Sequence, residues 1–493
     1  MNQIVTHFLA LLFLWPSIVG ANPNIVFILA DDLGWGELGC YGQEKIKTPN
    51  IDRLAAEGMR FTRHYTGAPV CAPARCVLMT GRHLGHAEIR DNGRSGNGRE
   101  FPGQRPISAE AVTIAEALKG AGYATGGFGK WGLGPTDTTG SPIRQGFDRF
   151  YGYNCQRNAH SFYPPFLDDD EGVEVINEKP IPGHLKAPVG EIRADDFRSD
   201  TYAPDRILEE ALEFIDTNKA TSFFLYCPFV EPHVAMHPPQ EWVDRYPKEW
   251  DEEKGVYRGQ NGYLPHPRPR AGYAAMISDL DEHVGAILER LEQHGLVENT
   301  MVIFTSDNGT THGSNDPAFG VGGVDAEFFN STAGLRGFKG SVYEGGIRVP
   351  CVVRWPGKVA AGSTTDVPSY FPDWFATLCG AAGAKAPEDI DGQDLAPVLT
   401  AGDGFVRKKP FVWEFHGYGG QIAVMDGDWK AIRQSVKRKK PDDWELYHLG
   451  RDSAEEEDIS ESQSAELKRL MKIYEGDRSP GPNDPLPLYD PSE

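Results

Sequence analysis

Positive charge is scarce in this chain relative to negative charge. The 493 residues include 49 Lys and Arg against 71 Asp and Glu, which gives a formal net charge of −22. Nothing along the sequence forms a basic stripe, and the short basic run at 437–440 is typical of a solvated loop. Nucleic-acid binders gather Lys and Arg to neutralise phosphates, so this composition excludes a general nucleic-acid-binding protein.

Long apolar runs are absent beyond the first 20 residues. The run from Phe8 to Val19 leads into Gly20-Ala21, and small residues at these places are typical of a signal-peptidase site. We therefore predict a signal peptide at 1–21 and an exported protein, periplasmic or extracellular, whose mature chain begins at Asn22. Because no Lys or Arg precedes the apolar run, a short N-terminal membrane anchor is the alternative. No other run is long enough to span a bilayer.

Cysteine is also sparse, and its pattern matches no structural framework. The chain has seven cysteines, an odd number, and their spacing resembles neither a disulfide scaffold nor a zinc site. In an exported protein this leaves at least one cysteine available for another role.

The hydrophobic pattern predicts an α/β fold. Strand-like apolar runs at 24–30, 222–228, 301–306 and 348–355 alternate with helical segments, and this order is typical of a largely parallel sheet. The clearest helix covers 273–294, where apolar residues recur at the helical period. We expect this helix to pack on the sheet.

The remaining segments suggest how the chain is divided. The stretches 164–200 and 236–270 are rich in proline, glycine and charge, so we predict surface loops that line a substrate cleft. Toward the C-terminus the pattern changes to short strands followed by a charged segment and a Pro-rich tail. We therefore predict a catalytic domain at 22–405 and a smaller C-terminal subdomain, with an antiparallel sheet, at 406–493.

Two acidic pairs each follow a predicted strand directly. Asp31 and Asp32 come after the first strand, and Asp307 and Asn308 come after 301–306. Either pair alone is more typical of a turn or a helix cap, but ligands of open α/β sheets gather at the carboxyl ends of the strands. Four oxygen donors without a His or Cys cluster favour a hard cation, so we predict calcium, with magnesium as the second choice.

The same region contains a glycine pattern of the dinucleotide-binding type, formed by Gly34, Gly36 and Gly39. Two carboxylates just before it would crowd a pyrophosphate, and residues 40–50 do not continue as the amphipathic helix that such a site needs. We therefore exclude a dinucleotide site here.

The most specific segment is Cys71-Ala72-Pro73-Ala74-Arg75, which is followed by Leu78-Met79-Thr80-Gly81. This segment resembles the signature of the sulfatase family, which has Cys or Ser, proline two residues on and arginine four on. The resemblance implies that Cys71 is oxidised to formylglycine (3-oxoalanine) by a separate maturation enzyme, a formylglycine-generating enzyme or an anaerobic maturase. It also implies that the modified side chain joins Asp31, Asp32, Asp307 and Asn308 as a metal ligand.

Formylglycine explains why a modified cysteine would serve here. Its hydrate carries two hydroxyls on one carbon, so one can attack sulfur while the other later loses its proton and expels sulfate. A serine could not release its sulfate ester in this way. The metal lowers the pKa of the nucleophile, and Arg75, one helical turn along, is expected to hold the modified side chain.

Further segments resemble the family and supply cations. Lys130 lies in Gly129-Lys130-Trp131-Gly132, which is no Walker loop because Trp follows the lysine. The resemblance implies that Lys130 bridges formylglycine and sulfate. His233, after the strand 222–228, and Lys339, before Tyr343-Glu344-Gly345-Gly346, would contact sulfate and the bridging oxygen, with one of them protonating the leaving alcohol.

One position departs from the family pattern. The family frequently has His where this chain has Gly132, and that His is thought to assist breakdown of the sulfated enzyme. Either another base reaches the site or breakdown proceeds differently. His160 and His312 are candidates for this role or for contacts with substrate at the rim.

The resemblance runs from Asn24 to about Pro356 with its motifs in the family's order, and a weaker match continues through Trp444 to Tyr447. It implies an alkaline-phosphatase-like fold, a large mixed and mainly parallel sheet between helices with a smaller C-terminal antiparallel sheet and helix. The predicted activity is that of a sulfuric ester hydrolase acting on a sulfated carbohydrate or an aryl sulfate. The alternatives are a formylglycine-dependent phosphonate or phosphodiester hydrolase, and an inactive sulfated-glycan binder.

Overall fold

The computed structural model describes residues 22–93, 104–185, 189–311, 320–400, 405–481 and 485–490. The predicted signal peptide at 1–21 and the candidate residue His312 lie outside these ranges. Among the helices in these ranges, none has both the length and the apolar character needed to cross a membrane.

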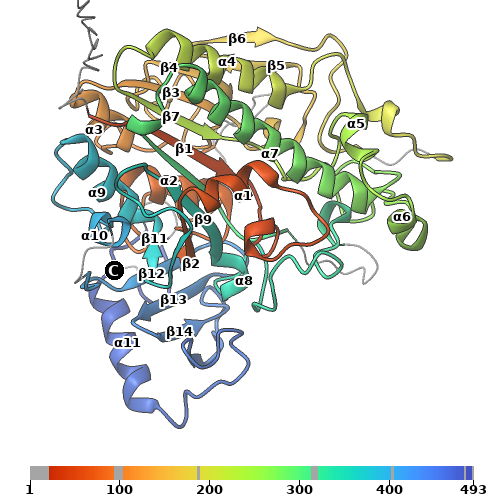
Figure 1. Cartoon of the computed structure of the whole chain (residues 1–493). Helices are drawn as coiled ribbons and strands as arrows, with labels where there is room; N and C mark the ends of the chain where they lie inside the picture. The colour runs from red at the N-terminus through yellow and green to blue at the C-terminus, as the bar shows by residue number, and fades with distance from the viewer. Residues whose placement is uncertain are drawn as a thin grey trace, which may run out of the picture.

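A large mixed sheet forms the centre of the molecule (Figure 1). Its five central strands run parallel to one another in the order β8, β1, β7, β3, β4, and this run has an antiparallel neighbour on each side, β9 next to β8 and β5 next to β4. Across the described ranges its strands are, in spatial order, β10 (Ser363–Thr365), β2 (Met59–Tyr65), β9 (Arg348–Arg354), β8 (Thr300–Ser306), β1 (Asn24–Ala30), β7 (Phe223–Pro228), β3 (Ala124–Lys130), β4 (Arg149–Tyr153), β5 (Phe166–Asp169) and β6 (Gly172–Val175), with β11 (Ser369–Tyr370) beside β2.

Helices cover both faces of this sheet, as the α/β pattern predicts. One face carries α1 (Pro49–Ala56), α4 (Ala203–Asn218), α5 (Gln240–Val243), α6 (Glu249–Lys254) and the long α7 (Pro269–Gln293). The other carries α2 (Cys71–Thr80), α3 (Ile114–Gly120), α9 (Phe371–Ala382) and α10 (Ala396–Leu399).

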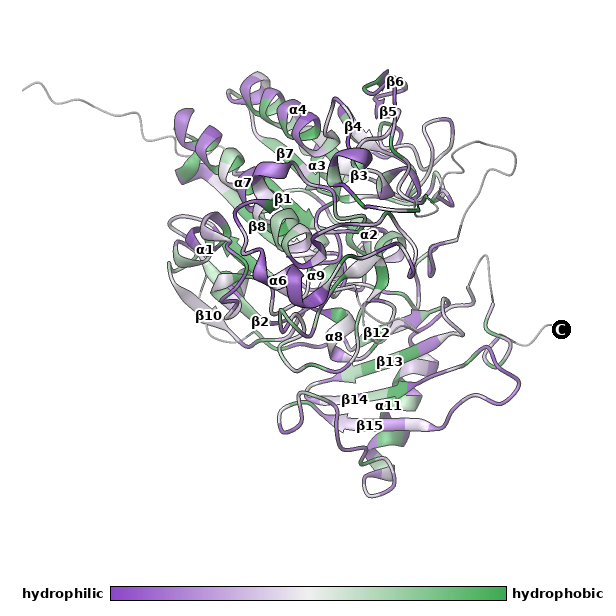
Figure 2. Cartoon of the chain, turned by 90° about the vertical axis from the view of Figure 1, so that its right-hand side faces the viewer, coloured by the Kyte–Doolittle hydropathy of each residue, from purple (hydrophilic) through white to green (hydrophobic). Residues whose placement is uncertain are grey.

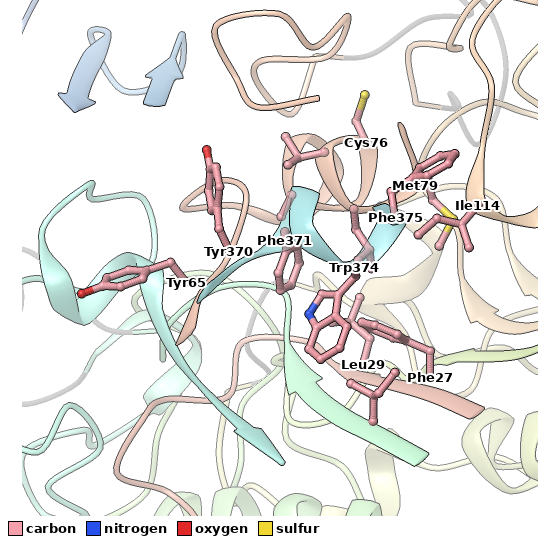
Figure 3. Close-up of a cluster of buried hydrophobic side chains, with 14 of the residues drawn as sticks. Phe27, Leu29, Tyr65, Cys76, Met79, Ile114, Tyr370, Phe371, Trp374 and Phe375 are labelled. Carbon is pink, nitrogen blue, oxygen red and sulfur yellow. The ribbon is translucent and has the colours of Figure 1, made fainter. Parts of the chain in front are cut away.

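The strand β1 shows why two separate hydrophobic cores form. Its residues are all buried, and because side chains alternate along a strand, Phe27 and Leu29 enter one core while Val26 and Ile28 enter the other. In the first core the ring of Trp374 from α9 meets Phe27 edge-on, with centroids 5.9 Å apart (Figure 3). These cores fix the ends of the central strands, where the polar residues gather.

A smaller antiparallel sheet follows, in the order β12 (Phe411–Phe415), β13 (Gln421–Asp426), β14 (Trp429–Arg433) and β15 (Trp444–His448). The helix α11 (Ser464–Gly476) packs on it, and both lie beside the large sheet (Figure 2). The buried Lys430 of β14 binds Glu344 at 2.8 Å, and Glu344 belongs to the short helix α8 (Glu344–Ile347) of the large unit. The predicted fold class is confirmed by these two sheets and their helices.

The two stretches predicted as loops contain more structure than expected. The segment 164–200 contains the hairpin β5–β6, which extends the large sheet at its edge, and 236–270 contains α5 and α6. These elements have four to six residues each, and β6 is mostly exposed, so neither shows the repeated apolar pattern by which longer elements are recognised.

Candidate active site

The predicted site residues meet at the carboxyl ends of four of the central strands. In the register of β1 and β8, Ala30 lies opposite Ser306, so Asp31 and Asp307 begin their loops side by side. The strand β3 ends at Lys130 on the same edge, and β7 leads into the loop that carries His233. The sheet therefore brings together residues that lie up to about 300 positions apart in the sequence.

The four predicted oxygen ligands form a buried cluster. Asp31, Asp32, Asp307 and Asn308 are each at most 1% exposed. The backbone N–H of Asp32 donates to Asp307 Oδ1 at 3.2 Å, and Asn308 Nδ2 donates to Asp32 Oδ1 at 2.8 Å. Burial and the charge of Asp31 raise the pKa of Asp307 to about 6. Three carboxylates this close repel one another, and nearby cations reduce this repulsion.

Asn308 provides a direct test of whether this cluster fits a metal ion. Its side-chain oxygen Oδ1 is buried and accepts no hydrogen bond from the residues that the structure describes, an arrangement that is costly unless a ligand fills the place. Carboxylate and amide oxygens are the donors that Ca²⁺ prefers. The residues therefore fit a hard cation, as the sequence analysis expected.

Cys71 is the first residue of α2, which starts after the extended Val70 and ends at Gly81 in a left-handed conformation. Its Sγ donates a hydrogen bond to Asp31 Oδ1 at 3.3 Å, and its side chain is 1% exposed. Burial and the carboxylate of Asp31 raise the pKa of the Cys71 thiol far above its usual value. An unmodified Cys71 is therefore a neutral thiol and a poor nucleophile at neutral pH.

Arg75 lies one helical turn after Cys71 and is completely buried. Its Nη2 and Nε donate to the same oxygen of Asp307, at 2.8 and 3.1 Å, and its Nη1 donates to the backbone carbonyl of Lys130. Arg75 therefore ties α2 to the ends of β8 and β3 and fixes the geometry between them.

Two lysines each contact one aspartate of the cluster. Lys130 Nζ lies 2.5 Å from Asp31 Oδ2, and Lys339 Nζ lies 2.6 Å from Asp32 Oδ1. Burial opposes the charged form of Lys339, but Asp32 holds its pKa well above the usual value. Burial likewise opposes ionisation of Asp31, but Lys130 and the neighbouring cations hold its pKa well below the usual range. Asp31 and Lys339 are therefore held in their charged forms.

His233 lies on the same cluster, with Nε2 3.7 Å from Asp32 Oδ2. Its Nδ1 lies 2.5 Å from the backbone oxygen of Val234, so Nδ1 carries the proton and Nε2 faces the cluster with a lone pair. Burial and the charge of Lys339 lower the pKa of His233 to about 4.

His160 belongs to a group of aromatic rings beside His233, of which the sequence predicted only His160 and His233 as site residues. His160 stacks on His233 with centroids 4.8 Å apart, and its Nδ1 lies 2.8 Å from His184 Nε2. Tyr263 contacts all three histidines, with centroid distances of 4.4 to 5.7 Å. We call His160, His184, His233 and Tyr263 the aromatic wall.

Other contacts with the cluster gave no signal in the sequence. Thr311 Oγ1 donates to Asp32 Oδ2, and the backbone N–H of Lys339 donates to the carbonyl of Thr310 at 3.0 Å. Tyr263 and His184 come from the two stretches of irregular composition that were predicted to line a cleft, but nothing singled them out within those stretches. Tyr263 has a φ of +62°, unusual for a bulky side chain.

Comparison with known proteins relates this site to one family. The family model described as Sulfatase matches residues 23–384, and the model described as N-sulphoglucosamine sulphohydrolase, C-terminal, matches residues 337–474. The first match contains every one of the clustered residues described above.

Individual relatives are similar in sequence to this chain over most of their length. Human steryl-sulfatase is 31% identical over 84% of this chain and 76% of its own length, and rat N-acetylgalactosamine-6-sulfatase is 31% identical over 98% and 85%. Among solved structures, Ps i-CgsB in complex with k-i-k-neocarrahexaose superimposes with a TM-score of 0.72 at 27% identity, covering 94% of this chain and 95% of the other.

Proposed function

Because the chain belongs to the sulfatase family and is a sulfuric ester hydrolase, we propose that it removes sulfate from a sulfated carbohydrate using formylglycine made from Cys71 and a bound calcium ion. One observation carries this proposal. Cys71 contacts Asp31 in a buried place that also gathers Asp307, Lys130 and Lys339.

Two groups complete the proposed site. Formylglycine in its hydrated form supplies two hydroxyls, one to attack sulfur and one whose deprotonation releases sulfate. Calcium supplies charge that favours the ionised nucleophile and screens the sulfate. Asp31, Asp32, Asp307, Asn308 and the modified Cys71 would hold the ion, and the neutral thiol of unmodified Cys71 supports the need for the modification.

The lysines and Arg75 have distinct roles in this proposal. Lys130 and Lys339 pair with the carboxylates nearest Cys71, so both can turn an ammonium toward sulfuryl oxygens as charge grows on them. Arg75 is engaged by Asp307 and by the Lys130 carbonyl, so it orients the modified side chain and the strand ends.

His233 is proposed to assist the leaving alcohol. Its Nδ1 is held by a backbone carbonyl, so only Nε2 can exchange a proton with substrate. An anionic sulfate ester beside the ring would favour protonation at Nε2, which then protonates the departing oxygen as the S–O bond breaks.

The aromatic wall and the relatives support a sulfated carbohydrate as the proposed substrate class. Tyr263, His160 and His184 offer stacking surfaces and polar edges next to His233, which suits a sugar ring as the leaving group. One relative is an N-acetylgalactosamine-6-sulfatase, and one structural neighbour binds a neocarrahexaose.

We also propose that the protein is exported after cleavage at 21, that a formylglycine-generating enzyme or anaerobic maturase acts on Cys71, and that 22–405 and 406–493 are its domains.

Two measurements test this function together. Mass spectrometry of the peptide around Cys71 should show conversion of the thiol to the aldehyde, and the matured protein should release sulfate from sulfated saccharides in the presence of calcium. An unmodified thiol at Cys71 in fully active protein would contradict the proposal that formylglycine is the nucleophile. Faster turnover of a phosphodiester than of a sulfate with the same aryl leaving group would favour the alternative hydrolase.

A further inference from the structure

The space above Gly132 is filled by another residue. Gly132 has a φ of +86°, and a Cβ built on it would lie 2.2 Å from Nε2 of Gln156 and 3.9 Å from Cδ of Arg75. A side chain at position 132 and the Gln156 amide therefore cannot occupy this space together. The Gln156 amide can therefore occupy this space only because residue 132 has no side chain.

The amide of Gln156 lies beside the site with an unused donor. Its Nε2 is buried and has no hydrogen-bond partner among the described residues. An amide nitrogen only donates, so it needs an acceptor. Arg75, whose Cδ lies 3.9 Å from the Cβ built on Gly132, has already committed its guanidinium to Asp307 and to the carbonyl of Lys130. The space above Gly132 is thus near the buried Arg75 and has an amide N–H without a partner among the described residues, a combination that favours an anion with several acceptor oxygens.

We propose that Gln156 is a further catalytic residue, whose amide N–H donates a hydrogen bond to a sulfuryl oxygen of the bound substrate. This inference rests on the proposed function. Gln156 takes the space in which the family frequently has His, but with different chemistry. A neutral amide donates without titrating and accepts no proton, so Gln156 stabilises charge on the sulfuryl group and does not act as a base.

A purely structural role for Gln156 makes a different prediction. If the side chain only fills space and supports Arg75, then Gln156→Met, which keeps its length and bulk, should preserve sulfate binding. If the amide binds sulfate, Gln156→Met should weaken it, and Gln156→Glu, which has the same shape but a negative charge, should weaken it further.

The test measures binding of inorganic sulfate by calorimetry in calcium-loaded, full-length protein carrying Cys71→Ala, so that maturation and turnover do not enter. We expect sulfate to bind about tenfold more weakly in Gln156→Met and still more weakly in Gln156→Glu, with unfolding temperatures unchanged. Gln293→Met alters an exposed glutamine at the end of α7 and should leave sulfate affinity unchanged. Sulfate affinity within twofold of the parent in both Gln156 variants would overturn the role.

A second pair of variants uses the steric conflict. Gly132→Ala should displace the amide and also strain the backbone at its φ of +86°, so it should weaken sulfate binding at least as much as Gln156→Ala, and adding Gln156→Ala to it should cause no further loss. If the losses of sulfate binding in the two single variants add in the double variant, then residue 132 and the Gln156 amide do not share this space. Loss of sulfate binding in the Cys71→Ala parent, or no sulfate release by matured wild-type protein, would instead overturn the proposed function and this role with it.

Discussion

The side-chain amide of Asn308 donates to Asp32 at 2.8 Å, while its oxygen stays buried without a hydrogen-bond partner in the described part of the chain. The hydrogen bond to Asp32 orients the oxygen of Asn308, because an amide that turns its nitrogen toward one carboxylate turns its oxygen the other way. Asp32 is itself held in a left-handed conformation, with a φ of +71°. Both residues therefore adopt costly arrangements that a bound cation would compensate.

Calcium should stabilise the folded protein through this cluster. At a calcium concentration 100 times Kd, linkage predicts a gain of about 2.7 kcal/mol in the free energy of unfolding, and a chelator should remove it. Asn308→Ala should lose most of this gain because it deletes one ligand. Urea unfolding with and without calcium measures the effect.

The control for this variant is Asn299→Ala, which alters an exposed asparagine just before β8. It should keep the full calcium response. An equal calcium response in Asn308→Ala and the wild type would show that Asn308 is not a ligand.

Much of this cluster could be predicted from sequence because its residues follow strongly apolar strands. The runs that end at Ala30 and Ser306 are buried throughout, so their strand character and the position of Asp31 and Asp307 are readable from composition alone. The partners from irregular segments could not be predicted. Gln156 and Tyr263 have no periodic neighbours, and their positions depend on long-range packing that no local pattern encodes.

Removing a lysine charge should slow catalysis without unfolding the protein. Lys339→Met and Lys130→Met each delete an ammonium that touches a cluster carboxylate, and loss of one such stabiliser typically lowers kcat by roughly 10²–10³. Steady-state kinetics with a sulfated saccharide measures this loss. Lys358→Met, at an exposed position, is the matched control. A loss below about threefold in either site variant would argue against direct charge stabilisation.

His233 should matter most when the leaving group is poor. A nitrophenolate departs without help, whereas a sugar hydroxyl needs a proton, so His233→Ala should lower kcat/KM by roughly 10² or more for a sugar sulfate and by much less for nitrophenyl sulfate. His294→Ala, at the far end of α7, should not distinguish the two substrates. Equal losses on both substrates would assign His233 to sulfate binding instead.

Tyr263 should contribute to recognition of the sugar and not to chemistry. Tyr263→Ala removes the ring that contacts three histidines, and we expect KM for a sulfated oligosaccharide to rise about tenfold, with little change for nitrophenyl sulfate. Tyr263→Phe retains the ring and should behave like the wild type for both. A similar rise in KM for nitrophenyl sulfate would place the effect on the sulfate site.

Glu37 should make the stability of the protein depend on pH. Its carboxyl group is completely buried, where it accepts hydrogen bonds from the Gly34 backbone at 2.5 Å and from Tyr273 Oη at 2.8 Å. Burial raises its pKa from 4.5 to about 7. The folded state thus binds this proton more tightly than the unfolded state, so the contribution is complete below pH 4.5 and is lost as pH rises through about 7.

Replacing Glu37 by glutamine should remove this dependence, because the amide stays neutral at every pH. Relative to the wild type, the free energy of unfolding of Glu37→Gln should rise by up to about 3 kcal/mol between pH 4.5 and 8. Urea unfolding at several pH values, with calcium saturating throughout, measures the difference. Glu213→Gln, at an exposed position of α4, should run parallel to the wild type. If Glu37→Gln also runs parallel, then the pKa of Glu37 is the same in the folded and unfolded protein, and the hydrogen bonds from Tyr273 and the Gly34 backbone offset its burial.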